Sequence, residues 1–158
     1  MSKLNYAKLS QAFQAIKTLT EQDKSKAYVF PSALRIKMGG NFRRLRDLLV
    51  EIETEQSQLF NTYGTPMTEP GKEGQFQVMK TSDKWLEFEA AYKALQAEEF
   101  EVALTPMTDV ELINSRVVKS RNDKGQVSEN TEENQIPLDL IADLQSTGLL
   151  PTGDPETT

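Results

Sequence analysis

The stretch MGGNFRRLRDLL, residues 38–49, places two glycines directly before three arginines, a pattern that raises the possibility of phosphate binding. A phosphate loop needs glycines whose N–H groups close on phosphate, then a Lys and a Ser or Thr that reach the terminal phosphates and Mg²⁺. Here Gly39 and Gly40 precede Asn-Phe-Arg-Arg, and a helical apolar spacing continues through them. The stretch therefore favours a helix that carries two glycines over a phosphate loop.

Each glycine costs about 1 kcal/mol relative to alanine inside a helix, so something is expected to compensate for Gly39 and Gly40. One explanation is the close approach of another helix, for which Ala12 and Ala15 are available. The other is a kink or a break at the glycines.

The residue types that the chain lacks exclude several kinds of chemistry. The 158 residues include no His and no Cys. Serine-histidine nucleophiles, HExxH zinc sites, thiolate metal sites and disulfides are therefore excluded. The loop from Asn122 to Gly125 lacks the ligand series of a calcium-binding EF-hand. A carboxylate-only metal site or a mechanism based on Lys or Tyr stays open, but we expect no enzyme, no cofactor and no metal.

Five basic residues in the first third form the candidate partner-binding site. At 100° per residue, Arg35 and Arg46 lie within about 20° of each other with Arg43 nearby, whereas Lys37 and Arg44 lie on another face. One interpretation is a solvated surface that pairs with acidic residues of a later helix: Glu87, Glu89, Glu98 and Glu99. The other is a docking surface for an acidic protein or, less consistent with the acidic chain and core-type aromatic residues, a nucleic-acid backbone.

Charge is distributed unevenly along the chain, whose formal net charge is −6. Residues 1–50 hold ten Lys or Arg and three Asp or Glu, whereas residues 51–158 hold eight and twenty-one. Opposite charges can pair within the fold or between copies, so a homo-oligomer is possible. No stretch of 18 apolar residues exists, and MSKLNYAKLSQAF has no apolar signal core. We expect a cytoplasmic protein without a membrane partner.

The strongest structural pattern predicts one long helix from about Pro31 to Tyr63, followed by Gly64 in a left-handed turn. Its apolar seam repeats at alternating steps of four and three residues: Met38, Phe42, Leu45, Leu49, Ile52, Gln56, Leu59 and Tyr63. This heptad spacing is typical of a helix whose narrow face packs on other helices or on a second chain.

Two further helices and two strands are predicted around it. A first amphipathic helix carries Tyr6, Leu9, Phe13, Ile16 and Leu19 on one stripe, and a third begins after an N-cap at Ser82 with Trp85, Phe88, Tyr92 and Leu95 as core residues. Alternating residues at 76–78 and 100–104 predict two short strands that pair with each other. Thr108 and Glu111 fit a capping box.

The C-terminal quarter is predicted to be a flexible acidic region. Residues 119–136 are nearly free of apolar side chains and are interpreted as a flexible linker after a helical body at 1–118. Residues 137–150 restore an amphipathic segment with Leu138, Ile141 and Leu144, which either folds back on the body or binds a partner as a tethered motif. Residues 151–158 are expected to be a disordered tail, and deletion of 119–158 to leave melting cooperative.

The order of these patterns resembles a family of small phage-encoded helical proteins of unknown function. The matching pieces are LSQAFQAIKTL, the long stretch from ALRIKM to FNTYG, GKEGQFQV, WLEFEAAYKALQAEEFEVAL and IPLDLIADL. The resemblance covers about two-thirds of the chain and depends on Tyr63-Gly64 and on the order of the helices. It brings no catalytic residues, and it implies an accessory protein of the kind encoded near virion or tail genes. If the protein is viral, the expected location is the host cytoplasm or the virion.

Together these observations predict a mostly α fold, an antiparallel helical hairpin or small bundle with a minor two-stranded β ribbon. The predicted function is that of a non-enzymatic phage-type accessory protein that binds a viral structural protein or a host protein. The alternative is a nucleic-acid-associated protein that uses the basic first third. The partner-binding residues are predicted to be Arg35, Lys37, Arg43, Arg44, Arg46, Leu138, Ile141 and Leu144.

Overall fold

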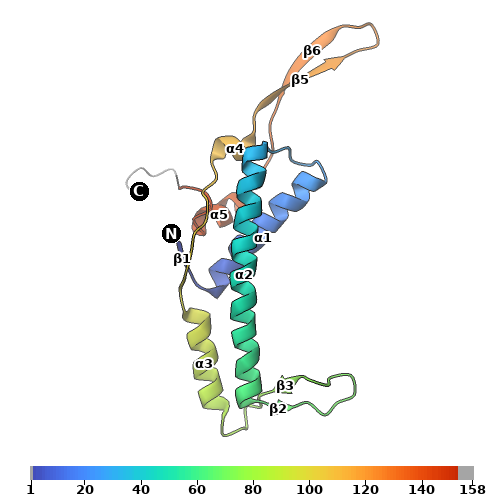
Figure 1. Ribbon diagram of the computed structural model, residues 1–158. Helices are drawn as coiled ribbons and strands as arrows, with labels where there is room; N and C mark the ends of the chain where they lie inside the picture. The colour runs from blue at the N-terminus through green and yellow to red at the C-terminus, as the bar shows by residue number, and fades with distance from the viewer. Residues whose placement is uncertain (1, 153–158) are drawn as a thin grey trace.

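The computed structural model describes residues 2–152, and about half of them are helical. Figure 1 shows a long central helix, α2, with α1 crossing behind it, α3 beside its C-terminal half, and two β ribbons projecting from its two ends. The chain is thus mostly α with short two-stranded antiparallel sheets.

Helix α2 spans Ser32–Tyr63 without interruption, as the heptad spacing predicts. Pro31 precedes it with extended dihedrals, φ −68° and ψ 154°, and supplies the carbonyl that the first helical N–H groups need. The buried side of the helix carries Leu34, Met38, Asn41, Leu45, Leu49 and Ile52. The remaining seam positions, Phe42, Gln56, Leu59 and Tyr63, are half-buried.

Gly64 ends α2, but for a different reason from the predicted one. Its φ of −93° is not left-handed. An added Cβ would instead collide with the carbonyl oxygen of Phe60 and lie 2.9 Å from that of Gln77. Gly64 is therefore required by the close approach of two backbone segments.

The two glycines inside α2 have neither of the predicted explanations. The helix continues through Gly39 and Gly40 as a single rod (Figure 1). An added Cβ would meet only the flexible ends of arginines on the same helix, Arg43 Nη1 at 3.7 Å and Arg44 Nη1 at 3.3 Å. No second helix of the described chain approaches them, and nothing in the structure compensates for the helix stability that glycine loses relative to alanine.

Helix α1, Tyr6–Lys24, supplies the other half of the core. Its first turn is capped by Asn5, whose Oδ1 accepts from the N–H of Lys8 at 3.0 Å. Its buried stripe, Leu9, Ala12, Ala15, Ile16 and Leu19, belongs to the same core cluster as the buried leucines of α2. Because this stripe has helical spacing, the first helix follows directly from the sequence.

Helix α3, Trp85–Ala97, packs against the C-terminal half of α2 through aromatic rings. Phe88 is buried, with its ring centroid 5.0 Å from that of Phe60, and Trp85 and Tyr92 lie half-buried around it. The residue that precedes the helix is Lys84 and not Ser82, although Ser82 Oγ accepts from the N–H of Lys84 at 3.2 Å.

The two predicted strands exist but pair with other segments. Strand β3, Phe76–Gln77, pairs with β2, Thr65–Pro66, directly after α2. Strand β4, Phe100–Val102, pairs with the N-terminal strand β1, Ser2–Leu4. The expected pairing was wrong because alternation identifies a strand but not its neighbour.

The segment expected to be a flexible linker forms a β hairpin. After α4, Asp109–Ile113, strands β5, Arg116–Arg121, and β6, Val127–Glu132, pair along their whole length. Turn chemistry explains the difference: Asn122 Oδ1 accepts from the N–H groups of Lys124 and Gln126, and Gly125 takes a φ of 75°. The capping box of Thr108 and Glu111 is confirmed.

Helix α5, Leu138–Ser146, folds back on the body, so the body extends past residue 118. Leu140, Leu144, Leu149 and Leu150 are buried in the same cluster as α1 and α2. Gln11 on α1 also donates to Asp143 on α5 at 2.7 Å. Of the expected disordered tail, 151–152 have no regular structure and 153–158 lie outside the described residues.

Candidate functional site

Three of the five candidate basic residues line one groove beside α2. Arg35, Arg43 and Arg46 lie along one face of α2 and face the C-terminal end of α1, which adds Lys24. The groove has a volume of about 430 Å³, and Met38 and Phe42 form its apolar floor. We call it the cationic groove, lined by Thr20, Asp23, Lys24, Arg35, Met38, Gly39, Phe42, Arg43 and Arg46.

One side of the cationic groove is held in place by a bidentate ion pair. Arg35 donates from Nε and Nη2 to the two carboxylate oxygens of Asp23, at 2.9 and 3.0 Å. The hydrogen bond and the charge of Asp23 raise the pKa of Arg35 above its usual range, so this guanidinium stays charged at every relevant pH. The pair joins the end of α1 to the first turns of α2.

The other cations of the groove are less constrained. Arg46 contacts its exposed neighbour Asp47 at 3.2 Å, and its guanidinium carbon lies 6.0 Å from the ring centroid of Phe42. Arg43 and Lys24 form no ion pair within residues 2–152. The groove therefore offers four cations around an apolar floor, with Asp23 as the one carboxylate that lines it.

The other two candidate cations lie outside this groove, as their helical positions predict. Lys37 donates to Glu111 Oε1 at 2.7 Å and so joins α2 to the capping box of α4. Burial raises the pKa of Glu111, but hydrogen bonds from Lys37 and Thr108 outweigh it and lower the pKa overall. Arg44 points along α2 toward Gly40.

The expected pairing of these cations with the acidic third helix is wrong. Among the ion pairs of the described chain, Arg35 uses Asp23, Lys37 uses Glu111, and Glu89 on α3 uses Lys93 of its own helix at 2.8 Å. The pairing fails because α3 lies against the C-terminal half of α2, whereas the basic residues are in its N-terminal half (Figure 1).

The C-terminal candidate residues do not form a tethered binding motif. Leu144 is fully buried and Ile141 is half-buried against the core, so folding back accounts for both. Leu138 alone stays available, with 83% of its surface exposed. Leu144 was predicted to bind a partner but is a core residue, because α5 packs its own apolar face against α1.

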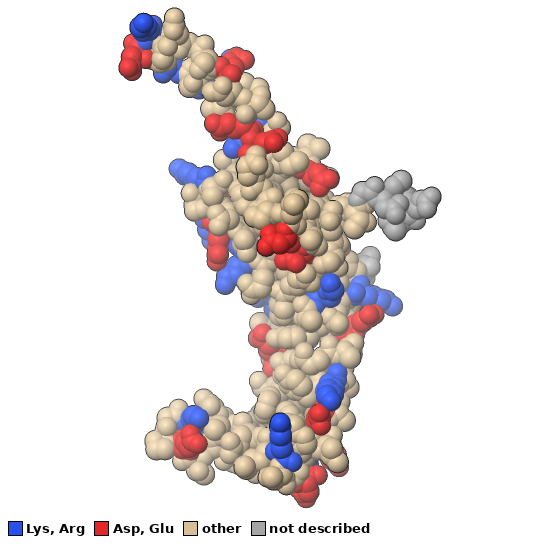
Figure 2. Space-filling model, turned by 180° about the vertical axis from the view of Figure 1, so that it is seen from behind, with Lys and Arg blue, Asp and Glu red and all other residues tan. Residues whose placement is uncertain are grey.

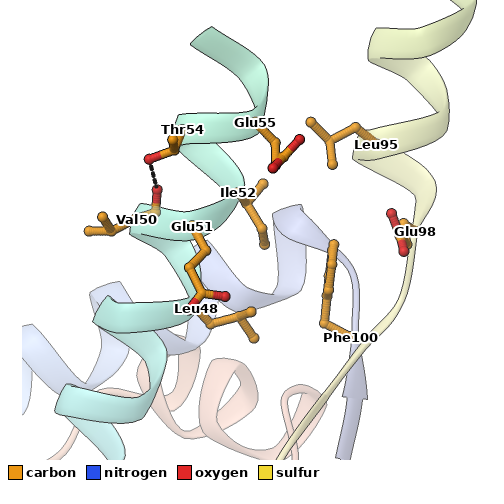
Figure 3. Close-up of a pocket in the computed structure, with 9 residues that line it drawn as sticks. All are labelled: Leu48, Val50, Glu51, Ile52, Thr54, Glu55, Leu95, Glu98 and Phe100. Atoms are coloured by element: carbon orange, nitrogen blue, oxygen red, sulfur yellow. Dashed lines mark hydrogen bonds between the residues drawn. The ribbon is translucent and has the colours of Figure 1, made fainter. Parts of the chain in front are cut away.

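A second groove, which the sequence did not predict, lies between α2, α3 and β4. Its volume is about 570 Å³, and its floor is Leu48, Ile52, Leu95 and Phe100. Figure 3 shows these apolar side chains facing one another from three elements, with the carboxylates of Glu51, Glu55 and Glu98 around them. We call it the acidic groove. The only clue to this groove in the sequence is the run of glutamates at 51–55 on α2. These residues become a wall of the groove only because α3 packs beside α2.

Three buried polar side chains, Asn41, Asn134 and Thr147, form hydrogen bonds with the backbone. Asn41 exchanges two hydrogen bonds with the backbone of Thr105, at 2.8 and 2.7 Å. Asn134 donates to the carbonyl oxygens of Val29 and Leu112 at 2.8 Å each, and Thr147 bonds to α5 carbonyls. These groups are used in folding and are not available to a ligand.

The described part of the chain contains no group of three or more acidic, His or Cys side chains placed to hold a metal ion. Within the same residues, no helix is both long and apolar enough to cross a bilayer. Comparison with models of known families, with curated proteins and with solved structures finds no match to this chain. The functional interpretation therefore depends on the geometry of the two grooves.

Proposed function

We propose that this protein is a non-enzymatic accessory protein of the phage type that binds another protein through its cationic groove. The occupant would be an acidic segment that also carries apolar side chains, from a virion or tail component or from a host factor. The observation that supports this most directly is the lining of the groove, in which four cations surround Met38 and Phe42. Carboxylates on an apolar segment would satisfy both parts of that surface.

The apolar floor favours a protein over a nucleic acid as the partner. Nucleic-acid surfaces without sequence preference combine cations with exposed aromatic platforms. Here the aromatic residues Phe60, Phe88 and Tyr92 contact one another between helices, and Phe42 lies against Phe13 with ring centroids 4.9 Å apart. Nucleic-acid association through the same arginines is the alternative.

The proposal treats α1, α2 and α3 as a small antiparallel helical bundle that holds the groove in a fixed shape. The bidentate pair between Arg35 and Asp23 and the core contacts of α1 with α2 support a rigid groove. Such preorganisation lowers the entropic cost of binding.

The test uses fluorescence anisotropy with a labelled peptide in which Asp and Glu alternate with Leu and Phe. The full chain should bind this peptide, and the double variant Arg43→Glu with Arg46→Glu should bind it at least about tenfold more weakly, because two attractive charges become repulsive. Lys80→Glu with Lys84→Glu, the same charge change at exposed positions beside the C-terminal end of α2, is the matched control and should bind nearly as the original chain.

Two further probes separate the proposal from its alternative. A peptide with Asn and Gln in place of Asp and Glu should bind weakly, since it lacks the charges. Double-stranded DNA should not bind at low salt. DNA binding that is lost with Arg43 and Arg46 and falls steeply with salt would replace the proposal with nucleic-acid association. Unchanged peptide binding by the double variant would overturn the groove assignment.

A further inference from the structure

The β5–β6 hairpin is an arm that buries almost nothing of its own. Residues 119–133 are all exposed, and the arm stands clear of the body beyond the N-terminal end of α2 (Figures 1 and 2). A two-stranded ribbon without a covered face is at best marginally stable in water. A ribbon of this kind gains stability when another surface covers it.

The base of the arm, in contrast, is fixed to the body. Asn134 follows β6, is 5% exposed, and bonds to the backbone of Val29 and Leu112, while its own N–H donates to Ile113 O at 2.8 Å. Arg116 at the start of β5 donates to the carbonyl of Asn114 at 3.0 Å. The arm therefore leaves the body in a defined direction, which favours a docking element over a loose loop.

The far end of the arm combines two unpaired cations with one apolar side chain. Arg121 lies opposite Val127 in the register, so the two side chains share a face, and Lys124 lies in the turn between them. Val127 is 55% exposed, and neither cation has an ion-pair partner among residues 2–152. We call Arg121, Lys124 and Val127 the arm tip. Asp123 in the same turn still leaves the turn with a net positive charge.

The acidic groove has the complementary composition. Glu51, Glu55 and Glu98 surround an apolar floor, and none of them forms an ion pair within the described chain (Figure 3). These three carboxylates line one groove without a cation, so a cationic occupant would be attracted to this site. An apolar side chain between two cations matches the groove in both charge and polarity.

A chain cannot fill its own groove with its own arm. The arm extends away from the N-terminal end of α2, whereas the groove lies between the middle of α2 and the end of α3 (Figure 1). The occupant must then come from a second molecule, and a second copy of this chain carries the complementary tip.

We propose that the arm tip of one copy docks in the acidic groove of another copy. The contact joins two different surfaces, so it is heterologous, and repetition produces a closed ring or an open chain of copies. It leaves the cationic groove free, so self-assembly and the binding of an acidic partner use separate parts of the molecule.

The first experiment measures molar mass against protein concentration by sedimentation. The full chain should self-associate, and added salt should weaken the association because the contact is electrostatic at its edge. Glu51→Lys with Glu55→Lys should sediment as a single chain at every concentration. Glu21→Lys with Glu53→Lys, an equal charge change on exposed positions outside the groove, should still associate.

The second experiment tests that the contact is heterologous. One chain has residues 117–131 replaced by a short glycine linker and keeps its groove, while the other carries Glu51→Lys with Glu55→Lys and keeps its arm. Each alone should be monomeric, and the mixture should form a one-to-one complex and nothing larger. A charge exchange within one chain, Arg121→Glu and Lys124→Glu together with Glu51→Lys and Glu55→Lys, should restore self-association.

Three results would overturn the proposal: a monomeric full chain at all concentrations, self-association that survives the loss of the arm, or a mixture that does not combine. Circular dichroism of each variant checks that the fold is retained. None of these variants changes the cationic groove, so failure here is distinguishable from failure of the proposed peptide binding, and the reverse also holds.

Discussion

Asn41 connects the long helix to a distant loop through a single side chain. It is fully buried, and both ends of its amide are bonded to the backbone of Thr105, 64 residues later in the chain. A primary amide is well suited to this position because it donates and accepts at once, as a neighbouring strand would. The segment after β4 is therefore fixed to α2 by hydrogen bonds, although it has no regular structure at Thr105.

Asn41→Ala should lower the free energy of unfolding by about 2–3 kcal/mol, since the N–H and C=O of Thr105 would both lose their partner at a partly buried position. Urea unfolding followed by circular dichroism measures this. Asn61→Ala, on an exposed turn of the same helix, is the control and should change stability little. A variant at position 41 as stable as the original would show that water replaces the amide.

Gly39→Ala and Gly40→Ala should each raise stability by up to about 1 kcal/mol. Both sites have helical backbone and only mobile arginine ends nearby, so alanine gains helix propensity without a lasting collision. Thermal melts of the single and double variants measure the gain. Gly64→Ala gives the contrast, because there the new Cβ meets backbone oxygens and stability should fall. Destabilisation at 39 or 40 would reveal an unseen constraint on α2.

The ion pair of Lys37 and Glu111 should make the free energy of unfolding depend on pH in the acid range. The pKa of Glu111 is lowered in the folded chain, so its contribution is complete above the ordinary glutamate pKa and is lost as pH falls through the lowered value. Lys37→Met should cost about 1 kcal/mol at neutral pH, and the difference should shrink below that pKa. Lys93→Met, which removes an exposed pair, should show a smaller effect. A cost of Lys37→Met that stays constant while the pH is lowered until acid unfolds the chain would contradict this.

At the scale of elements, α5 and the arm differ in what they contribute to the core. Helix α5 buries Leu140 and Leu144, and the residues that follow it add Leu149 and Leu150 to the same core cluster, whereas the arm buries none of its residues from 119 to 133. Because α5 completes the core, a deletion that includes it is no longer expected to leave melting cooperative, contrary to the expectation from sequence.

Two truncations test this difference. Ending the chain at residue 135 should abolish cooperative melting or lower the melting temperature sharply, because several leucines of α1 and α2 lose their cover. Replacing residues 117–131 with a short glycine linker should leave the transition cooperative. Differential scanning calorimetry of both chains decides the matter. Equal loss of cooperativity in both would mean that the arm also supports the body.

At the scale of the whole molecule, α2 organises everything else. One side of it holds the core, one flank forms the cationic groove with α1, and the other forms the acidic groove with α3 and β4. The basic-then-acidic order of the sequence thus becomes two grooves of opposite charge along one helix. Both depend on α2 staying intact through residues 32–63.

Leu45→Asp should unfold the body, since position 45 is fully buried and an unpaired carboxylate there has no compensating partner. Far-UV circular dichroism should show a loss of helix signal. Val50→Asp makes a comparable change on the exposed side of the same helix, where 55% of the residue is accessible, and should keep the fold. A folded Leu45→Asp chain would contradict the packing described for α2.

Sequence alone determined the features that depend on nearby residues. The limits of α2, the buried stripe of α1 and the capping box of Thr108 and Glu111 follow from spacing and from local hydrogen bonds. The grouping of Arg35, Arg43 and Arg46 also follows, because helical geometry fixes which side chains share a face.

Tertiary structure decided the features that join distant residues. The pairing of β4 with β1, the docking of α5 and the walls of both grooves each depend on contacts between segments far apart in the chain. Residue spacing does not specify which segments pack together, because several different segments could pair with a given strand or cover a given apolar face. Only the packed chain selects among those neighbours, and the two opposite grooves result from that selection.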